Sequence, residues 1–399
     1  MTEIRPPRVR ALARGAALLL AALATALPAA AGATTAGGGE APGAAPAGLV
    51  GLSVPPRVAV NRSFVGPLIE LFGDVRVGQR VLVTANTVLD AAPGGRICVG
   101  DGTNIQDNVV LRASRTVPAT HPSACGALAA AIDRDAIVAH QASITNSTVG
   151  RFTFVGFRAR LEDAVLDEGA FVLHGATIRG VRVGADRLVP VGATITTQAE
   201  ADALPAKTGA EADFQRAVLA VNAELAEQYA ALYTAEGQDA VSGVSAGPRT
   251  SWLPGAVRPT LGREVRLLEF ARLIGDVRLG DGSRVGKRAA IRADEGSPIE
   301  VGAGARISDR VTFHALRGTS VRVGRDLRAG VNAVLHGPLR AGDRLVLEED
   351  AVLFDATVGD DVTIGSEAVV AGVTLPDGVR VPPGAAITTQ AQADALRAR

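Results

Sequence analysis

The stretch GDVRLGDGSRVGKRAAIRADEGSPIEVGAGARISDRVTFHA, from Gly275 to Ala315, indicates the fold of this chain. Apolar residues recur in it near Gly or Asp about every six positions, as at Val277, Val301 and Ile307. That period is neither helical nor the simple alternation of a half-buried strand. A six-residue repeat with small residues at its corners predicts a parallel β-helix, whose coils stack about 4.8 Å apart.

A second copy of this stretch lies earlier in the chain, where GDVRVGQRVLVTANTVLDAAPGGRICVGDGTNIQDNVVLRA begins at Gly73. The two copies also share an ending, VPVGATITTQAEADAL in the first and VPPGAAITTQAQADAL in the second. With 3% aromatic residues and 46 glycines, the core must consist of Val, Ile, Leu and Ala, with glycine at tight turns. The sequence therefore predicts two complete, mainly β domains in tandem.

Ahead of the first copy, Arg5, Arg8, Arg10 and Arg14 precede an apolar run at 16–27 and then small residues near Ala31 or Ala33. This order is typical of a secretory signal peptide, and the run is shorter than the roughly 20 residues of a membrane span. The predicted segments are a signal peptide at 1–33, an Ala-, Gly- and Pro-rich disordered tether at 34–50, a first domain at 51–236, a linker at 237–259 and a second domain at 260–399. We therefore expect a secreted, periplasmic or extracellular protein.

A helix is predicted from Ala210 to about Glu236, within the first domain. Apolar residues recur there at spacings of three and four, at Phe214, Val218, Val221, Leu225 and Tyr229. An end coil of a β-helix offers unpaired backbone groups, so we expect this helix to cap the first copy. The second copy ends at Arg399 without such a helix.

Charge and cysteine content restrict the possible partners. The chain has 41 basic and 41 acidic residues, so its zero formal charge gives no indication of a nucleic-acid partner or of an anionic membrane surface. Cys98 and Cys125 either form a disulfide in an oxidising compartment or remain two small apolar residues. Two thiols are too few for a cysteine zinc site.

Three of the five histidines, His140, His314 and His336, are divided between the copies. With the copies aligned, the residues opposite them are Val331, Arg112 and Thr145, respectively. Neither copy has three histidines at these positions, but the two copies together do. The sequence thus predicts one metal site made by both halves.

The chain resembles the γ-class carbonic anhydrases over most of both copies. The strings that carry the resemblance are RADEGSPIEVG at 292–302, GTNIQDNVV at 102–110, VAHQ at 138–141, LHGP at 335–338, the ITTQAEADAL ending and the VNAELAEQY helix. The resemblance implies a left-handed β-helix that assembles as trimers, with zinc or a related metal at each subunit interface. It places two metal ligands at His314 and His336 and the third, from the neighbouring β-helix, at His140.

The resemblance implies further site residues, which are also divided between the copies. Arg292, Asp294 and Glu295 correspond to Asp90, Ala92 and Pro93; Asn104 and Gln106 correspond to Arg306 and Ser308; Asn222 has no counterpart. We expect Gln106 to orient a metal-bound hydroxide, with Asn104 and Asn222 shaping the polar side of the pocket. Arg292, held by Asp294 and by Asp107 or Asp309 across the interface, is expected to hold the oligomer together and to lie close to the product bicarbonate. Glu295 is expected to relay a proton.

The predicted function is that of a carbonic anhydrase, a metal-dependent lyase that reversibly hydrates CO₂ to bicarbonate. Three neutral imidazoles leave Zn²⁺ a free position where water becomes hydroxide near neutral pH, and Fe²⁺ or Co²⁺ also suit such ligands. Two alternatives are a catalytically inactive scaffold protein of the same family and, less favoured, a hexapeptide acyltransferase with one histidine as general base.

Assembly follows less directly from the sequence. A ring of three β-helices cannot be tiled by one chain that carries two. We expect a homo-oligomer with mixed, trimer-like rings, or a closed arrangement of two domains. Whether the site forms within one chain or between chains stays open at this point.

Overall fold

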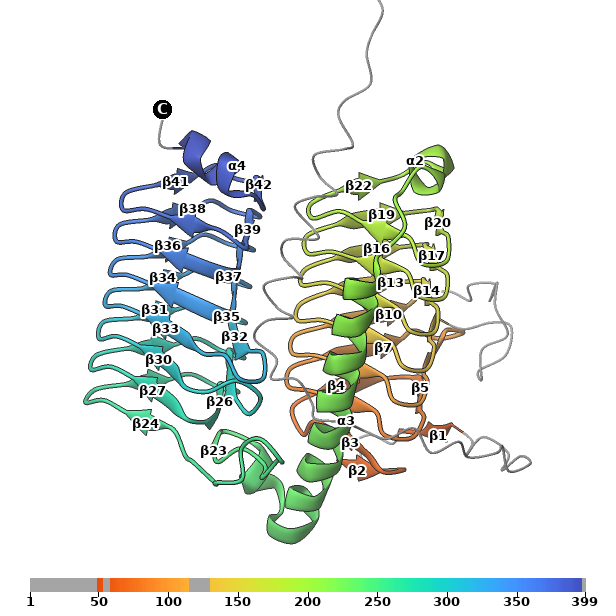
Figure 1. Ribbon diagram of the computed structural model, residues 1–399. Coiled ribbons are helices and arrows are strands. Elements are labelled where there is room, and N and C mark those ends of the chain that lie inside the picture. The colour runs from red at the N-terminus through yellow and green to blue at the C-terminus, as the bar shows by residue number, and fades with distance from the viewer. Residues whose placement is uncertain (1–48, 53–57, 115–129, 397–399) are drawn as a thin grey trace, which may run out of the picture.

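The computed structural model describes residues 49–52, 58–114 and 130–396. Two left-handed parallel β-helices lie side by side, which confirms the predicted fold (Figure 1). The predicted signal peptide and nearly all of the predicted tether lie outside the described residues. Among the described residues, no helix combines the length and apolar character that a membrane span requires.

Three sheets form the sides of the first β-helix, and each coil adds one strand to each sheet. One sheet contains β1 (Val50–Gly51), β5 (Asp74–Val77), β8 (Arg96–Val99), β11 (Ala130–Ile132), β14 (Thr148–Val149), β17 (Val165–Leu166) and β20 (Arg182–Val183). The next contains β2 (Ala59–Val60), β3 (Ser63–Val65), β6 (Leu82–Val83), β9 (Asn104–Ile105), β12 (Ile137–Val138), β15 (Phe154–Val155), β18 (Phe171–Val172) and β21 (Leu188–Val189). The third contains β4 (Glu70–Phe72), β7 (Val88–Ala91), β10 (Val110–Ala113), β13 (Ser143–Thr145), β16 (Arg160–Glu162), β19 (Thr177–Arg179) and β22 (Thr194–Ile195).

The second β-helix repeats this plan, but two of its sides join through the long strands β35 and β37. The joined sheet contains β23 (Val244–Ser245), β24 (Thr260–Leu261), β26 (Arg272–Gly275), β27 (Val277–Leu279), β29 (Ala290–Ala293), β30 (Ile299–Val301), β32 (Thr312–Ala315), β33 (Val321–Val323), β35 (Val334–Ala341), β37 (Val352–Val358), β39 (Val369–Ala371), β40 (Thr374–Leu375) and β42 (Ala386–Ile387). The remaining side contains β25 (Arg266–Leu267), β28 (Arg284–Val285), β31 (Arg306–Ile307), β34 (Arg328–Ala329), β36 (Val346–Leu347), β38 (Thr363–Ile364) and β41 (Arg380–Val381).

Aliphatic side chains stacked coil upon coil fill the interior of each β-helix. Val99 and Ile105 are fully buried in the first core, and Val285 and Ile291 in the second. Each such side chain contributes about 1.5–3 kcal/mol by leaving water. Cys98, on β8, is disulfide-bonded; Cys125, the chain's other cysteine, lies outside the described residues.

The repeated endings form short helices that cover the last coil of each copy. These are α2 (Gln198–Asp202) and α4 (Gln390–Ala395), and each begins with a capping box, from Thr197 and Thr389 respectively. Ala201 and Ala393 of these helices belong to the two cores. These two short helices were not predicted from the sequence.

The predicted long helix is present as α3 (Gly209–Glu236). It does not lie across the end coil, which α2 covers, but runs lengthwise along the first β-helix (Figure 1). Its apolar face, with Leu225 and Tyr229, packs on Phe64 and Leu82 of the first copy and Ile274 of the second. Along the side of the β-helix, the long apolar face of α3 is buried against both copies. A single end coil is too small to cover a helix of this length.

The predicted linker contains structure of its own. The 3₁₀-helix η1 (Gln238–Val241) follows α3, and β23 then pairs in parallel with β26. The second β-helix therefore begins within the segment predicted as linker, before residue 260.

The β-helices meet along a corner of the first copy. Asn86, Asn108 and Gln141 occupy this corner on successive coils in the left-handed region, with φ of 60°, 59° and 61°. Asparagine tolerates this conformation because its short polar side chain hydrogen-bonds locally. The amides donate to the second copy: Asn86 to Arg288 O (2.8 Å), Asn108 to Thr312 Oγ1 (3.0 Å) and Gln141 to Arg310 O (2.8 Å). An ion pair between Arg158 Nη1 and Asp350 Oδ1 (2.6 Å) extends the contact.

Candidate metal centre

The second copy places two histidines next to each other on one outer face. His314 on β32 and His336 on β35 are direct partners in the parallel register. Residues opposite each other in adjacent strands are about 4.8 Å apart, so the imidazoles project side by side. On β29, Arg292 directly follows Ile291, the partner of Phe313, and so lies one coil before His314; Phe354 on β37 is the partner of His336 one coil later.

The first copy supplies the third histidine from its corner. His140 follows β12, and its Nε2 lies 3.3 Å from His314 Nδ1. One nitrogen from each of His140, His314 and His336 lies within 4.8 Å of the others, and all three residues are buried. The three histidines thus converge within a single chain, which answers the question of intrachain or interchain assembly for this site.

The donor set suits a divalent metal. With Zn–N bonds of about 2.0–2.1 Å, the edge of a tetrahedral site is about 3.3 Å, which is the separation of the His140 and His314 nitrogens. The outer nitrogens face acceptors: His140 Nδ1 lies 3.3 Å from Asp107 Oδ2, His314 Nε2 3.3 Å from Asp294 Oδ1 and His336 Nδ1 2.9 Å from Gly337 O. Such contacts leave the inner nitrogens free and hold each ring in place.

Burial keeps the imidazoles of His140 and His336 neutral, as metal ligation requires. Burial lowers the pKa of His140 to about 4, although Asp107 opposes this shift. It also lowers the pKa of His336 well below the ordinary range. Protons therefore compete little for these nitrogens near neutral pH.

Arg292 joins the carboxylates of both copies behind the histidines. Its Nε lies 2.9 Å from Asp107 Oδ2 of the first copy, and its Nη1 lies 3.2 Å from Asp294 Oδ2 of the second. Burial alone would raise the pKa of both carboxyls, but the Arg292 charge holds each well below its usual range. Of the two aspartates considered across the interface, the structure selects Asp107; Asp309 instead accepts the Lys287 backbone N–H (2.8 Å).

Tyr229 of α3 is a site residue that the sequence analysis treated only as part of an apolar helix face. Its hydroxyl donates to Asp294 Oδ2, and the carboxylate also touches His314. Burial raises the pKa of Tyr229 well above its ordinary value, so the phenol stays a donor. The only sequence signal was its place at the end of VNAELAEQY, because the spacing of apolar residues cannot show where a hydroxyl points.

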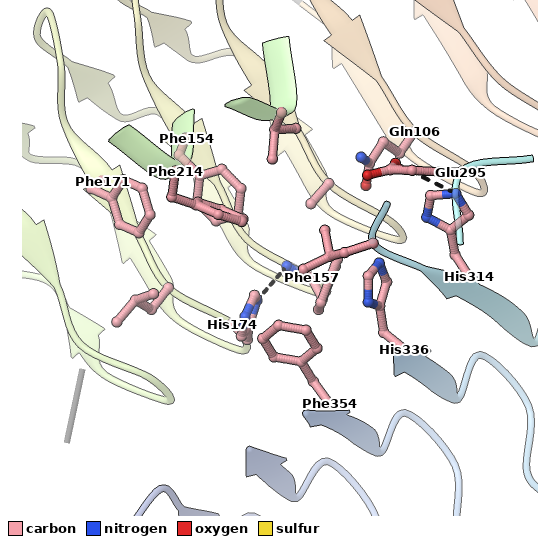
Figure 2. Close-up of a pocket in the computed structure, with 14 residues that line it drawn as sticks. Gln106, Phe154, Phe157, Phe171, His174, Phe214, Glu295, His314, His336 and Phe354 are labelled. Carbon is pink, nitrogen blue, oxygen red and sulfur yellow. Dashed lines mark hydrogen bonds and ion pairs between the residues drawn. The ribbon is translucent and has the colours of Figure 1, made fainter. Parts of the chain in front are cut away.

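Gln106 and Glu295 lie together beside His314 at one end of a pocket (Figure 2). Gln106 Oε1 accepts the His140 backbone N–H at 3.2 Å. Glu295 Oε1 accepts the Arg317 backbone N–H at 3.1 Å, and its Oε2 lies 3.8 Å from His314 Nε2. Burial raises the pKa of Glu295.

The pocket extends from the histidines into an apolar region. His336 stands beside Phe157 and Phe354, and further aromatic rings form the far wall (Figure 2). The phenylalanines that line the pocket are Phe154, Phe157, Phe171, Phe214 and Phe354. Polar groups therefore gather at one end of a largely apolar cavity, an arrangement typical of small-molecule sites.

Comparisons with known proteins identify the family. The chain is 30% identical to a carbonic anhydrase of Methanosarcina thermophila over 178 residues, which is 42% of this chain and 72% of that protein. The chain belongs to the γ-class carbonic anhydrase family. Gamma carbonic anhydrase 1 of Arabidopsis thaliana, a mitochondrial protein, is 30% identical over 134 residues, covering 33% of this chain and 44% of that one.

One relative of this γ-class chain is named for assembly and not for carbonic anhydrase activity. A carboxysome assembly protein, CcmM of a Nostoc species, is 33% identical over 171 residues, or 42% of this chain. The match spans only 30% of the Nostoc protein. A scan against protein-family models finds no match.

Two amides expected in the γ-class site are buried but are not among the described residues that line the pocket. Asn104 is fully buried, and neither polar atom of its side chain has a hydrogen-bond partner among the described residues. Asn222 Nδ2 donates to Val218 O one turn earlier in α3. Their roles on the polar side of the γ-class site stay predictions.

His174, which is not one of the three predicted ligands, lies in the pocket wall of this γ-class site. Its ring stacks on Phe157 with centroids 4.3 Å apart, and its Nδ1 accepts the Phe157 backbone N–H at 3.1 Å. Burial lowers its pKa to about 3. It is a hydrogen-bonded core residue outside the three-histidine cluster.

Lowering the pH from 7 to 5 is expected to destabilise the metal-free protein. Unfolded histidine takes up a proton near pH 6.5, whereas His140, with a pKa of about 4, and His174, with a pKa of about 3, stay neutral when folded. Their contribution to stability is complete above pH 6.5 and is lost as the pH falls toward these values. At pH 5 the loss is about 2 kcal/mol per histidine.

Urea denaturation at both pH values measures this effect, and His174→Phe should show a smaller loss than the wild type. The depressed carboxyl pKa values act only below about pH 4, and the raised pKa of Glu295 acts in the opposite direction. An unfolding free energy that is equal at pH 7 and pH 5 would contradict the prediction.

Proposed function

We propose that this protein is a metal-dependent carbonic anhydrase that reversibly hydrates CO₂ to bicarbonate at the site between its two copies. The observation that carries the proposal is the convergence of His140, His314 and His336, each with its outer nitrogen facing an acceptor. A family member that bound no metal between its copies would not need three histidine nitrogens arranged in this way.

His140, His314 and His336 would hold the metal, for which we propose Zn²⁺, with Fe²⁺ or Co²⁺ as alternatives that imidazoles also bind. When bound, a divalent ion lowers the pKa of a coordinated water to about 7 and so supplies a nucleophile at neutral pH. Asp107 and Asp294 orient the rings of His140 and His314.

Side chains around the histidines serve the substrate and the proton. The phenylalanine wall offers CO₂, a small apolar molecule, a region without competing hydrogen bonds. Gln106, held near His140, presents its amide N–H₂ as a donor to the reacting oxygen. Glu295 has a pKa raised by burial and lies next to His314, which suits the transfer of a proton from the pocket.

Names of relatives support the family activity but also a second candidate. The Methanosarcina protein is called a carbonic anhydrase, whereas the Nostoc protein is called an assembly protein. An inactive scaffold is therefore the alternative function. The single-histidine base of a hexapeptide acyltransferase gains no support from a three-histidine cluster.

Location and assembly belong to the same proposal. We propose export through the signal peptide at 1–33, which would place the protein outside the cytoplasm. We also propose that chains associate as homo-oligomers, since each copy has an outer face that the other copy does not cover.

A stopped-flow assay of CO₂ hydration with the zinc-loaded chain tests the proposal. Activity should require metal, and Gln106→Ala should lower kcat by about 10–100-fold while zinc content is retained. Lys287→Ala, which changes an exposed side chain, is the control and should keep full activity. If the fully loaded chain hydrates CO₂ no faster than buffer, the scaffold function replaces the enzyme.

A further inference from the structure

Four arginines form a straight row on the second β-helix. In the parallel register Arg266 lies opposite Arg284, Arg284 opposite Arg306 and Arg306 opposite Arg328. The rungs are about 4.8 Å apart, so the row extends over about 14 Å. All four side chains are exposed. We call this row the arginine ladder. It lies on the sheet whose strands β31, β34, β36, β38 and β41 are labelled in the left-hand body of Figure 1.

The side chains of the arginine ladder are not engaged by neighbouring carboxylates in the described part of the chain. Within the described ranges, none of its four side chains makes an ion pair or a side-chain hydrogen bond. Several other exposed arginines on the same β-helix do, as Arg325 with Asp343 (2.7 Å) and Arg344 with Asp361 (2.6 Å). Like charges directly opposite each other in a sheet are destabilising, so the ladder is unfavourable to the isolated fold.

The first copy shows that the fold does not need charges at these positions. The equivalent residues on β3, β6, β9 and β12 are Phe64, Leu82, Asn104 and Ile137, all at most 1% exposed. That face of the first copy is covered by α3 and the second copy and carries Gln106 of the site. On the second copy the same face has become cationic and open to solvent. One backbone thus serves two different surfaces.

Small residues accompany the arginine ladder. Side chains two positions apart point to the same side of a strand, and the residues two positions after Arg284, Arg306 and Arg328 are Gly286, Ser308 and Gly330. The guanidinium groups therefore stand along one edge of a strip that has almost no side-chain relief. An extended chain can lie on such a strip and reach successive arginines.

We propose that the arginine ladder binds an extended anionic polysaccharide. The planar guanidinium fork pairs with carboxylate or sulfate groups through two hydrogen bonds. Proteins that bind single-stranded nucleic acid add aromatic side chains on which the bases stack. The arginine ladder and the strip of small residues beside it contain no aromatic side chain. The formal charge of the whole chain is zero, so the attraction would come from this local cluster and not from the net charge. The proposal does not depend on catalytic activity.

The test measures binding of two probes, an oligogalacturonate and dextran sulfate, to the full chain by isothermal titration calorimetry at low and physiological salt. Arg284→Gln/Arg306→Gln should weaken binding about tenfold or more and reduce the dependence of affinity on salt. The matched control is Arg278→Gln/Arg322→Gln, which removes the same charge from two exposed arginines that flank Glu300. The control should change affinity less than twofold.

Circular dichroism and zinc content should be equal in all three proteins, since none of the substituted residues belongs to the metal centre. Equal weakening in both double variants would overturn the proposal, because binding would then follow net charge alone. Absence of saturable binding to both probes would also overturn it. So would ladder-dependent binding of only a DNA duplex or of anionic phospholipid vesicles, or a ladder-dependent change in oligomeric state without saccharide binding.

Discussion

Replacing His140 by alanine is expected to lower the affinity of the chain for zinc on the order of a thousandfold, because one of three ligands is lost. The remaining pair, His314 and His336, sits in the other copy, 174 residues or more along the chain from His140. Two imidazoles cannot complete a closed set of protein ligands. Titration of the metal-free protein with zinc, followed by dialysis and metal analysis, gives the stoichiometry. The wild type should retain one ion per chain and the variant none.

His174→Gln is the control for this experiment. His174 is buried in the same pocket but lies outside the three-histidine cluster, and glutamine can still accept the Phe157 N–H. It should keep full zinc stoichiometry. Should His140→Ala retain one tightly bound zinc and full activity, a metal centre shared by the two copies would be ruled out.

Replacing Arg292 by methionine should cost about 3–5 kcal/mol of unfolding free energy. Arg292 is 1% exposed and pairs with Asp107 and Asp294, both also buried. Without the guanidinium, two carboxylates from different copies face each other with no cation between them. Each would have to take up a proton or admit water. Urea denaturation of the metal-free protein at pH 7 measures the loss.

A compensating variant separates charge from packing. Adding Asp107→Asn and Asp294→Asn to Arg292→Met removes the unpaired carboxylates and should recover part of the lost stability. Arg284→Met, at an exposed position, should change the unfolding free energy by less than about 0.5 kcal/mol. If Arg292→Met were as stable as the wild type, the carboxylates would not depend on this residue.

The fold could be predicted from the sequence because its strongest signal is local. A six-residue period specifies which side chains point inward on every coil, as Val285 and Ile307 do, whatever lies outside. The division of the histidines could also be predicted, because alignment of the copies compares equivalent backbone positions. These inferences need no knowledge of how the two β-helices are placed.

Contacts between the copies could not be predicted in the same way. The choice of Asp107 over Asp309 depends on which outer face meets which, and the repeat places an aspartate at both positions. The apolar residues of α3 would have the same spacing whether the helix packed over the end coil or along the side of the β-helix. Its position along the side could therefore not be inferred from the sequence. The hydroxyl of Tyr229 reaches Asp294 only because α3 lies there.

The aromatic pocket could not be predicted from the sequence for a related reason. Its rings come from both copies and from α3, including Phe171, Phe214 and Phe354, and they are far apart in a sequence with few aromatic residues. Only the docking of the three segments brings them together. Half of the ten phenylalanines of this chain therefore meet in the lining of one pocket.

The amides at the corner of the first copy make a contact that tolerates substitutions in the second copy. Asn86 and Gln141 grip mainly carbonyl oxygens of the second copy, which every residue type possesses. Substitutions at Arg288 or Arg310 would leave those oxygens in place. During evolution, many surface residues of the second copy could therefore be substituted. The two copies would still keep the relative placement on which their shared site depends.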